Sequence, residues 1–287
     1  MSESSFKPVV VNPWNAAWSL CWRELVRFLR QRNRVIGAIG QPILFWLLFG
    51  AGMNQTFSEE ATGANFLEYY VSGTIMLIVL FTAIFATISI IEDRKEGFLQ
   101  AVLVAPIPRW SMVLGKVMGG TILAVMQGML FLILASMITI SIGPLEILAI
   151  LFLLIVIGIG LTSLGFVLAW RMDSTQGFHA IMNLLLMPMW LLSGAFFPVP
   201  SILGDSSSGA PSSGDYFMHW IMRCNPLTYA MASLREIMYW GDATAPLPGR
   251  GELPSFEVNL TVTLLFALIM FILACRVARE PAEGDLR

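Results

Sequence analysis

The residues of this chain best suited to chemistry form a charged cluster between two long apolar stretches. Five consecutive charged residues are followed by a glycine and a short apolar segment, 98–105, that proline ends: Glu92, Asp93, Arg94, Lys95, Glu96, Gly97, Phe98 and Leu99, with Pro106 after the segment. Charged side chains are costly inside a bilayer, and proline stops a helix. The pattern therefore indicates electrostatic docking of a short helix to a soluble partner, outside the membrane.

Patterns for catalysis, metal binding or nucleotide binding are missing from the sequence. Gly115-Lys116 is followed by Val117 and lacks the upstream glycine of a phosphate-binding loop. The two histidines are isolated, and neither a His-Glu-x-x-His nor a Gly-x-Ser-x-Gly motif occurs. The three cysteines fit no metal or redox spacing. We expect no enzymatic activity, no metal and no cofactor in this chain.

The elements around the cluster are those of an integral membrane protein. Of the 287 residues 56% are hydrophobic and 13% are charged, against about 25% charged in soluble domains. A spanning helix needs about 20 apolar residues. This criterion predicts an all-α membrane protein with six transmembrane helices at about 35–53, 69–91, 112–142, 147–170, 179–197 and 258–275. A tail with an interfacial helix (1–34), a loop (198–257) and a second tail (276–287) complete the predicted domains.

The distribution of Lys and Arg predicts the orientation. Fourteen of the 17 fall on the side of both termini, and only Arg223, Arg235 and Arg250 fall on the other. The positive-inside rule then makes the first side cytoplasmic. We expect a multi-pass protein of the plasma membrane, the inner membrane in a bacterium, with both termini in the cytoplasm. Arginines interrupt every apolar run in residues 1–33, so the first span would act as the insertion signal.

An amphipathic helix precedes the first span. Trp14, Trp18 and Trp22 recur at helical spacing, and a row of basic residues lies on the opposite side: Arg23, Arg27 and Arg30. Tryptophans at headgroup depth and arginines facing phosphates or an acidic partner would suit a helix lying in the membrane interface. Membrane anchoring alone produces the same pattern, so anchoring and docking both remain open.

Glycines recur along single faces of the third and fourth spans, at positions 115, 119, 120 and 128 and at positions 158, 160 and 165. Small residues let helices approach closely in lipid, so we expect these faces to pack against other helices. Ionisable groups are nearly absent from the middles of the spans, which disfavours a proton-coupled or ion-coupled carrier. The energy for any transport would then come from another subunit.

The segment before the last span has two short apolar pieces, 216–223 and 228–240, separated by Asn225-Pro226. Each piece is too short to cross a bilayer. They are predicted to be re-entrant or interface-lying helices, with Asn225, Pro226, Tyr229 and Arg235 as the characteristic residues. Such backbone is tolerated at membrane depth only where protein or water satisfies it.

In order along the chain, these segments resemble the membrane domain of ABC-2 type exporters. The resemblance is carried by residues 92–110 with Leu114-Gly115-Lys116, by 192–198 (Leu-Ser-Gly-Ala-Phe-Phe-Pro), and by 225–229 (Asn-Pro-Leu-Thr-Tyr) with Arg235. It covers nearly the whole chain. Relatives of this layout handle drugs, lipids and polysaccharides; the residues 103–106 (Leu-Val-Ala-Pro) and the lack of a large outer domain favour the drug and lipid branch.

The resemblance implies a homodimeric permease that pairs with a separate ABC ATPase subunit, which would bind ATP and Mg²⁺. Contact with that ATPase would fall to the residues Glu92, Arg94, Lys95, Glu96, Gly97, Phe98, Leu99, Arg23, Arg27 and Arg30. A translocation route between protomers would be lined by the second and fifth spans, with candidates Thr74, Thr82, Thr87, Ser89, Asn183, Met187, Met189 and Ser193. Such a mostly apolar wall would suit an amphipathic drug, lipid or lipid-linked cargo. Membrane lipid is a further expected partner, and nucleic acid is not.

Two alternatives remain from the sequence. A permease for polysaccharide export, of the capsule or O-antigen type, has the same layout. A membrane assembly factor without transport activity would need no ATPase and would tolerate changes at 92–97. An intramembrane enzyme is less favoured, because the spans offer no paired polar residues at depth.

Overall fold

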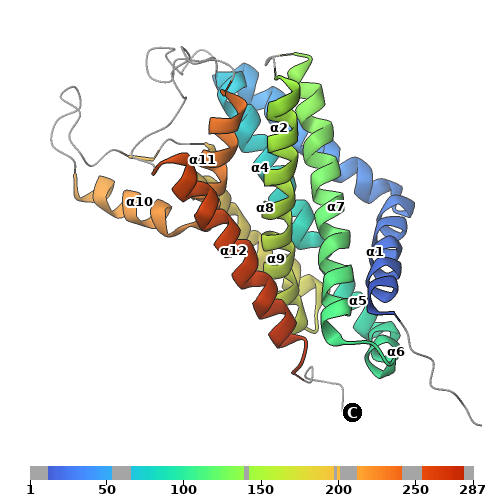
Figure 1. Cartoon of the computed structure of the whole chain (residues 1–287). Coiled ribbons are helices and arrows are strands. Elements are labelled where there is room, and N and C mark those ends of the chain that lie inside the picture. Colours follow the sequence, from blue (N-terminus) through green and yellow to red (C-terminus); the bar gives the residue numbers. More distant parts are fainter. Residues whose placement is uncertain are drawn as a thin grey trace, which may run out of the picture.

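The computed structural model describes residues 12–53, 66–138, 142–196, 199–200, 212–240 and 254–280. Within these ranges every regular element is a helix, and most of the helices run side by side in one bundle (Figure 1). The helices are α1 (Pro13–Arg30), α2 (Arg32–Met53), α4 (Phe66–Ala86), α5 (Ile88–Lys95), α6 (Phe98–Val104), α7 (Arg109–Ser136), α8 (Pro144–Trp170), α9 (Thr175–Trp190), the π-helix η1 (Leu191–Ala195), α10 (Ser213–Cys224), α11 (Pro226–Met238) and α12 (Phe256–Val277).

Five helical segments in the described part of the chain are long and apolar enough to cross a membrane. They are Glu68–Lys95, Arg109–Ser136, Pro144–Trp170, Thr175–Ala195 and Phe256–Val277, and they correspond to the second to sixth predicted spans. The first predicted span, 35–53, lies within α2, whose side chains are described only in part. The six-span layout therefore stays a prediction, whereas the all-helical membrane fold is confirmed.

Two of the predicted spans differ from the observed helices. The span 69–91 is interrupted at Thr87, between α4 and α5, where the Thr87 hydroxyl donates to the carbonyl of Ile84 (2.6 Å) instead of facing outward. The span 112–142 begins at Arg109 and ends at Ser136, six residues early. An apolar window extends through the β-branched run 138–140, but such residues favour the helix less than unbranched ones.

The glycine faces pack between helices, as predicted. A Cβ on Gly120 of α7 would come within 2.6 Å of Thr162 on α8, and one on Gly165 of α8 would come within 2.8 Å of Thr87. Gly128 similarly faces Val79 of α4. The absence of side chains at these positions lets α4, α7 and α8 pack closely at the centre of the bundle.

The amphipathic helix α1 runs beside the first half of α7, in the same direction (Figure 1). The hydroxyl of Ser111 at the start of α7 donates to the carbonyl of Pro13. One turn further, a Cβ on Gly115 would lie 2.6 Å from the carbonyl oxygen of Ala17. The face of α1 that carries Trp14, Trp18 and Trp22 is exposed. Amphipathicity is confirmed, and the contact of this tryptophan face with lipid stays a prediction.

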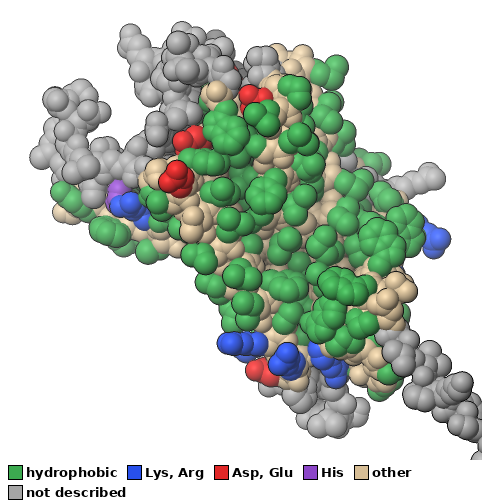
Figure 2. Space-filling model, in the orientation of Figure 1, with side chains coloured by type: hydrophobic (Ala, Val, Ile, Leu, Met, Phe, Trp, Pro, Cys, Tyr) green, Lys and Arg blue, Asp and Glu red, His purple; other side chains and the backbone are tan. Residues whose placement is uncertain are grey.

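Charge and apolar surface are separated along the bundle. On the face in Figure 2, Lys and Arg side chains gather at the lower end, near the ends of α8 and α12, and apolar side chains cover the surface above them. Arg171 follows α8 at this end and lies 3.9 Å from Glu280. Exposed leucines and isoleucines of α12, among them Leu264, Leu268 and Ile272, belong to the apolar region. This arrangement suits a helical bundle surrounded by lipid.

Candidate coupling site and cavity

A buried ion network centred on Asp93 joins three helices at the charged end of the bundle. The side chain of Asp93, near the end of α5, is fully buried. The guanidinium of Arg23 on α1 donates to both of its oxygens at 2.9 and 2.6 Å, and Arg27 donates at 2.8 Å. Lys116 of α7 donates to Asp93 from the other side. The carboxylate of Asp93 thus pairs with three cations. Such pairing offsets the free-energy cost of removing its charge from water.

The same network contains a second buried carboxylate, Glu24 of α1. The ammonium of Lys116 donates to Glu24 at 2.5 Å, and it also lies 3.3 Å from the hydroxyl of Ser89. Glu24 has room beside α7 because Gly119 faces it; a Cβ there would lie 2.8 Å from the Cβ of Glu24. Hydrogen bonding to Asp93 raises the pKa of Arg23 above its already high value, so this guanidinium stays charged.

The remaining charges of the cluster at 92–96 point in two directions. Arg27 reaches Glu92 at 2.8 Å and Glu96 at 3.4 Å, which ties α1 to the rim of α5. Arg94 turns instead toward the end of α8, where it donates to the carbonyl of Trp170 at 2.6 Å and lies 3.2 Å from Asp173. The end of α5 is therefore held on one side by α1 and on the other by α8.

The structure brings most of the predicted coupling residues together, but it uses them within the chain. Arg23, Arg27, Glu92 and Arg94 all have partners on other helices of the same chain. Only three charged members of the predicted set are exposed, namely Arg30, Lys95 and Glu96. Direct contact of these residues with an ATPase stays a prediction. Their charges are already paired within the chain, so they are less available to a partner.

Three members of the network were not among the predicted site residues: Glu24, Asp93 and Lys116. A signal was present in the sequence, because Glu24 is the lone acid of α1 and Lys116 is the lone cation of the glycine-rich face of α7. Isolated charges on packing faces need counter-charges. Sequence spacing alone did not reveal which ones they meet.

Helix α6 is docked under the network and presents an apolar tip. Gly97 precedes it in the left-handed conformation (φ 77°), which turns the chain between α5 and α6. The ring of Phe98 lies 3.7 Å below the guanidinium carbon of Arg23, and Leu99 is buried. At the other end of α6, Val104 is 85% exposed. The predicted segment 98–105 is thus a helix with one anchored side and one free side.

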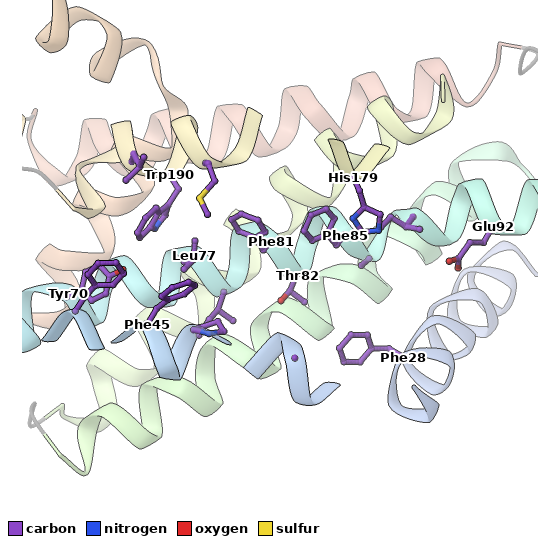
Figure 3. Close-up of a pocket in the computed structure, with 18 residues that line it drawn as sticks. Phe28, Phe45, Tyr70, Leu77, Phe81, Thr82, Phe85, Glu92, His179 and Trp190 are labelled. Carbon is purple, nitrogen blue, oxygen red and sulfur yellow. The ribbon is translucent and has the colours of Figure 1, made fainter. Parts of the chain in front are cut away.

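A cavity of about 710 Å³ with several aromatic rings in its wall lies among α1, α2, α4, α5, α9 and η1. Figure 3 shows its length: Tyr70 and Trp190 lie at one end, Phe81 and Phe85 in the middle, and Glu92 at the other. Its wall has few polar groups, among them Thr82, Glu92 and His179. The imidazole of His179 packs 5.0 Å from the ring of Phe85. This combination of apolar walls and sparse polar groups is typical of sites for amphipathic ligands.

Of the predicted path residues, Thr82 and Met187 line this cavity. The hydroxyl of Thr82 donates to Gln127 at 2.8 Å. Four other candidates are absent from its lining and are buried with hydrogen-bond partners. The hydroxyls of Thr74, Thr87 and Ser193 donate to the carbonyls of Tyr70, Ile84 and Trp190, and the hydroxyl of Ser89 accepts from Lys116. Asn183 is exposed on α9, and the carbonyl of Met189 accepts a bond from Asn225. Buried hydroxyls need a partner, and a carbonyl one turn earlier in the chain supplies it for three of the four.

The predicted segment around Asn225 satisfies the backbone where α9 ends. The α-helical hydrogen bonding of α9 gives way to the π-helix η1, and α11 supplies donors to its carbonyls. The amide of Asn225 donates to Met189 at 2.6 Å, Thr228 donates to Leu192 at 3.2 Å, and Arg235 donates to Ala195 at 3.4 Å. Protein groups thus satisfy the irregular backbone, as required away from water.

The other residues of this segment shape the elbow between α10 and α11. Pro226 occupies the first position of α11, where a missing N–H costs nothing. Tyr229 donates to the carbonyl of Arg223 at 2.8 Å and so holds the end of α10. The two predicted pieces overlap the helices α10 and α11, and their re-entrant or interface-lying placement in the membrane stays a prediction.

Comparison with known proteins agrees with this geometry. Residues 15–239 match the family described as "ABC-2 type transporter". The chain is 24% identical over 268 residues to the transport permease ycf38 of Cyanophora paradoxa, which covers 90% of this chain and 87% of that protein. It is 26% identical over 197 residues to nodulation protein J of Rhizobium leguminosarum bv. viciae, covering 66% and 72% respectively.

The matched region includes α1, the charged cluster, α6 and the elbow between α10 and α11, so it contains the coupling site and the cavity. A match over most of the chain, with all-helical structure and several membrane-crossing helices, is sufficient to assign the family. The chain belongs to the ABC-2 type transporter family, whose members are the membrane subunits that work with an ABC ATPase subunit.

Proposed function

We propose that this chain is the permease of an ATP-driven exporter that acts as a homodimer with two copies of a separate ATPase. It would lie in the plasma membrane, the inner membrane in a bacterium, with its termini in the cytoplasm. Closure of the ATPases on ATP would press on α6, and the cavity would open alternately to the two sides of the membrane. ATP and Mg²⁺ would be held by the partner subunit.

One contact carries the coupling proposal: Arg23 touches α6 and the buried network together. Its guanidinium lies over Phe98 and is paired with Asp93, which also binds Lys116 of α7. A displacement of α6 would move α1 and α7 with α5, because separating them leaves charges unpaired in a buried place. Coupling between distant sites needs such a contiguous element with two positions.

The free side of α6 supports contact with a partner. Val104 is a large apolar side chain almost wholly in the open, at the charged end of the bundle and away from the apolar surface. Burial of Val104 against the ATPase would remove apolar area from water, which favours association. Most charges of the cluster at 92–96 are paired within the chain. We therefore infer that the ATPase contacts Val104 at the end of α6 and the exposed charges Lys95 and Glu96.

The chemistry of the cavity supports an amphipathic drug, lipid or lipid-linked cargo. Aromatic and aliphatic side chains provide most of the wall, and its polar groups Glu92 and His179 lie away from the end that holds Tyr70 and Trp190. A molecule with an apolar body and one polar end would match this polarity. A bare polysaccharide would leave many hydroxyls without partners, each at a cost in free energy.

The test is reconstitution with the ATPase encoded nearest to the gene. Both proteins are purified together and placed in vesicles, and ATP-dependent movement of a fluorescent phospholipid is measured. Phe98→Ala should keep the complex and its ATP hydrolysis but lower transport, since it removes the contact between α6 and Arg23. Thr175→Ala, a change at the first residue of α9 and away from α6, is the control.

Each outcome separates the alternatives. Transport of a soluble polysaccharide without any lipid would replace the cargo proposal. Absence of any stable ATPase complex would favour an assembly factor. Normal coupled transport in Phe98→Ala would contradict the role of the Arg23 contact.

A further inference from the structure

Four aromatic rings meet at the end of the cavity opposite Glu92. Phe49, Tyr70 and Trp190 come from α2, α4 and α9 and line the cavity. Phe196 does not line it, but its ring lies 5.7 Å from both Phe49 and Tyr70 and 6.4 Å from Trp190. Edge-to-face contacts at such distances are favourable packing. We call these four residues the aromatic plug.

The position of Phe196 depends on η1. Gly194 has a left-handed backbone (φ 83°), which reverses the chain at the end of the π-helix just before Phe196. The carbonyl of Gly194 accepts a bond from Tyr69 at 3.1 Å. Gly73 of α4 lies against the next residue, since a Cβ there would be 2.7 Å from the carbonyl oxygen of Ala195. The chain leading into Phe196 is therefore pressed directly on α4.

Arg235 holds this backbone in place. Its side chain is only 7% exposed, its Nε donates to Ser72 at 3.1 Å, and a terminal nitrogen donates to the carbonyl of Ala195 at 3.4 Å. The guanidinium lies 4.0 Å from the centre of the Tyr69 ring. Among the described residues no carboxylate forms an ion pair with it. Within the described part of the chain, one charge thus joins α4, α11 and η1 through neutral partners.

We propose that the aromatic plug is the outer gate of the cavity and that Arg235 is the positioning residue that keeps it closed. The inference rests on the proposed function for the meaning of "outer". Arg235 holds Ala195, and Ala195 sets Phe196 against the other three rings. Opening moves η1 about Gly194 and breaks hydrogen bonds to neutral carbonyls, among them those from Arg235 to Ala195 at 3.4 Å and from Tyr69 to Gly194 at 3.1 Å. Among the described residues it separates no ion pair, in contrast to the network around Asp93, so the plug is the more easily opened end.

The test measures access to the cavity from outside the cell. The three native cysteines are replaced by serine, and Leu77→Cys is added as a reporter, because Leu77 lines the cavity two turns along α4 from Tyr70. A membrane-impermeant methanethiosulfonate is applied to intact cells and to inside-out vesicles. We expect Arg235→Gln to raise the rate of modification from outside by about tenfold or more, the size of effect that one lost charged hydrogen bond gives.

Arg223→Gln is the matched control, since it removes one positive charge from α10 without touching the plug. Arg235→Lys should fall between, because an ammonium can reach one acceptor but not hold two in a fork. Phe196→Ala should raise the rate with Arg235 in place. Modification from the inside should stay unchanged in all folded variants, which a general loosening of the fold would not allow.

Equal outside rates in the parent and in folded Arg235→Gln would overturn the inference, even if Phe196→Ala raised the rate. If Arg235→Gln fails to reach the membrane, the outside modification rate is measured in Ser72→Ala and Phe196→Ala instead. Rates equal to that of the parent in both variants would overturn the inference. The labelling needs neither cargo nor ATPase. Absence of transport activity would therefore contradict the proposed function without changing the labelling result. Equal labelling rates would contradict the gate without changing the transport result.

Discussion

Arg23 and Asp93, 70 positions apart in the sequence, form a two-pronged ion pair with nitrogen to oxygen distances of 2.9 and 2.6 Å. This pair fixes the amphipathic helix α1 against the end of α5. Lys116 of α7 also pairs with Asp93 and so joins α7 to the two helices. The charged cluster at 92–96, which the sequence suggested as a free docking surface, is thus partly used in ion pairs that hold the helices of the bundle together. What remains for a partner is the tip of α6 with the charges beside it.

Removing the central carboxylate should be far more harmful than removing a rim carboxylate. Asp93→Asn leaves the buried Lys116 and the partly buried Arg23 and Arg27 with too few counter-charges, and we expect a loss of about 3–5 kcal/mol of stability. Glu92→Gln, at a half-exposed pair with Arg27, should cost less than about 1 kcal/mol. Thermal unfolding of the purified proteins in detergent measures both. Similar losses in the two variants would show that Asp93 is not the centre of the network.

Close packing of α1 on α7 should depend on Gly115. In Gly115→Ala the new methyl group would lie 2.6 Å from the backbone carbonyl of Ala17, which cannot move as a side chain can. We expect a cost of about 1–3 kcal/mol and faster proteolysis within α1. Gly40→Ala on α2 is the control, because nothing lies within 4 Å of its added carbon. Protection of α1 in Gly115→Ala equal to that in the control would contradict the packing role.

The tip of α6 should decide binding of the ATPase without affecting the fold. Val104→Glu places a charge at a side chain that is 85% exposed, so the unfolding temperature should not change. Affinity for the ATPase, measured with both proteins in detergent, should fall by about tenfold or more if Val104 is buried in the complex. Gln176→Glu adds the same charge on α9. Equal affinities in these two variants would place the interface elsewhere.

Thr82 and Gln127 should behave as a pair. Their hydrogen bond is 2.8 Å long, and the amide nitrogen of Gln127 is buried without a partner. Thr82→Val should therefore destabilise the protein by about 1–3 kcal/mol, because it leaves the Gln127 oxygen unsatisfied as well. Adding Gln127→Leu should restore much of that loss. A double-mutant cycle by thermal unfolding tests this, and strictly additive losses would rule out the coupling.

Cysteine modification should follow burial and pH. Burial, and then the charge of Glu24, raise the pKa of the Cys21 thiol, whereas Cys224 is exposed. The thiolate is the reactive form, so a raised pKa leaves less of it at neutral pH. At pH 7 Cys224 should react with a maleimide well before Cys21, and the rate at Cys21 should keep rising as the pH is raised. Mass spectrometry of digests measures both; equal rates at pH 7 in the folded protein would contradict the burial of Cys21.

Local features of the sequence predicted the individual helices well. The segment 98–105 is the helix Phe98–Val104, and the break at Asn225-Pro226 separates α10 from α11. Glycines at 115, 120 and 165 lie where helices meet. These features follow from short-range rules for proline, glycine and apolar periodicity, which act within a few residues. The ends of the predicted spans stay predictions; the helix Arg109–Ser136 covers the first part of the predicted span 112–142.

The sequence by itself determined the membrane class, the helical segments and the family resemblance, because hydropathy and proline or glycine effects are local. Only the tertiary structure decided how the charges and hydroxyls are used. Asp93 meets Arg23 because α1 packs beside α7, and the buried hydroxyls of Thr74 and Ser193 donate to the carbonyls of Tyr70 and Trp190, one turn earlier. Partners of buried polar groups depend on which helices become neighbours, and that choice is made by the packing of the whole chain.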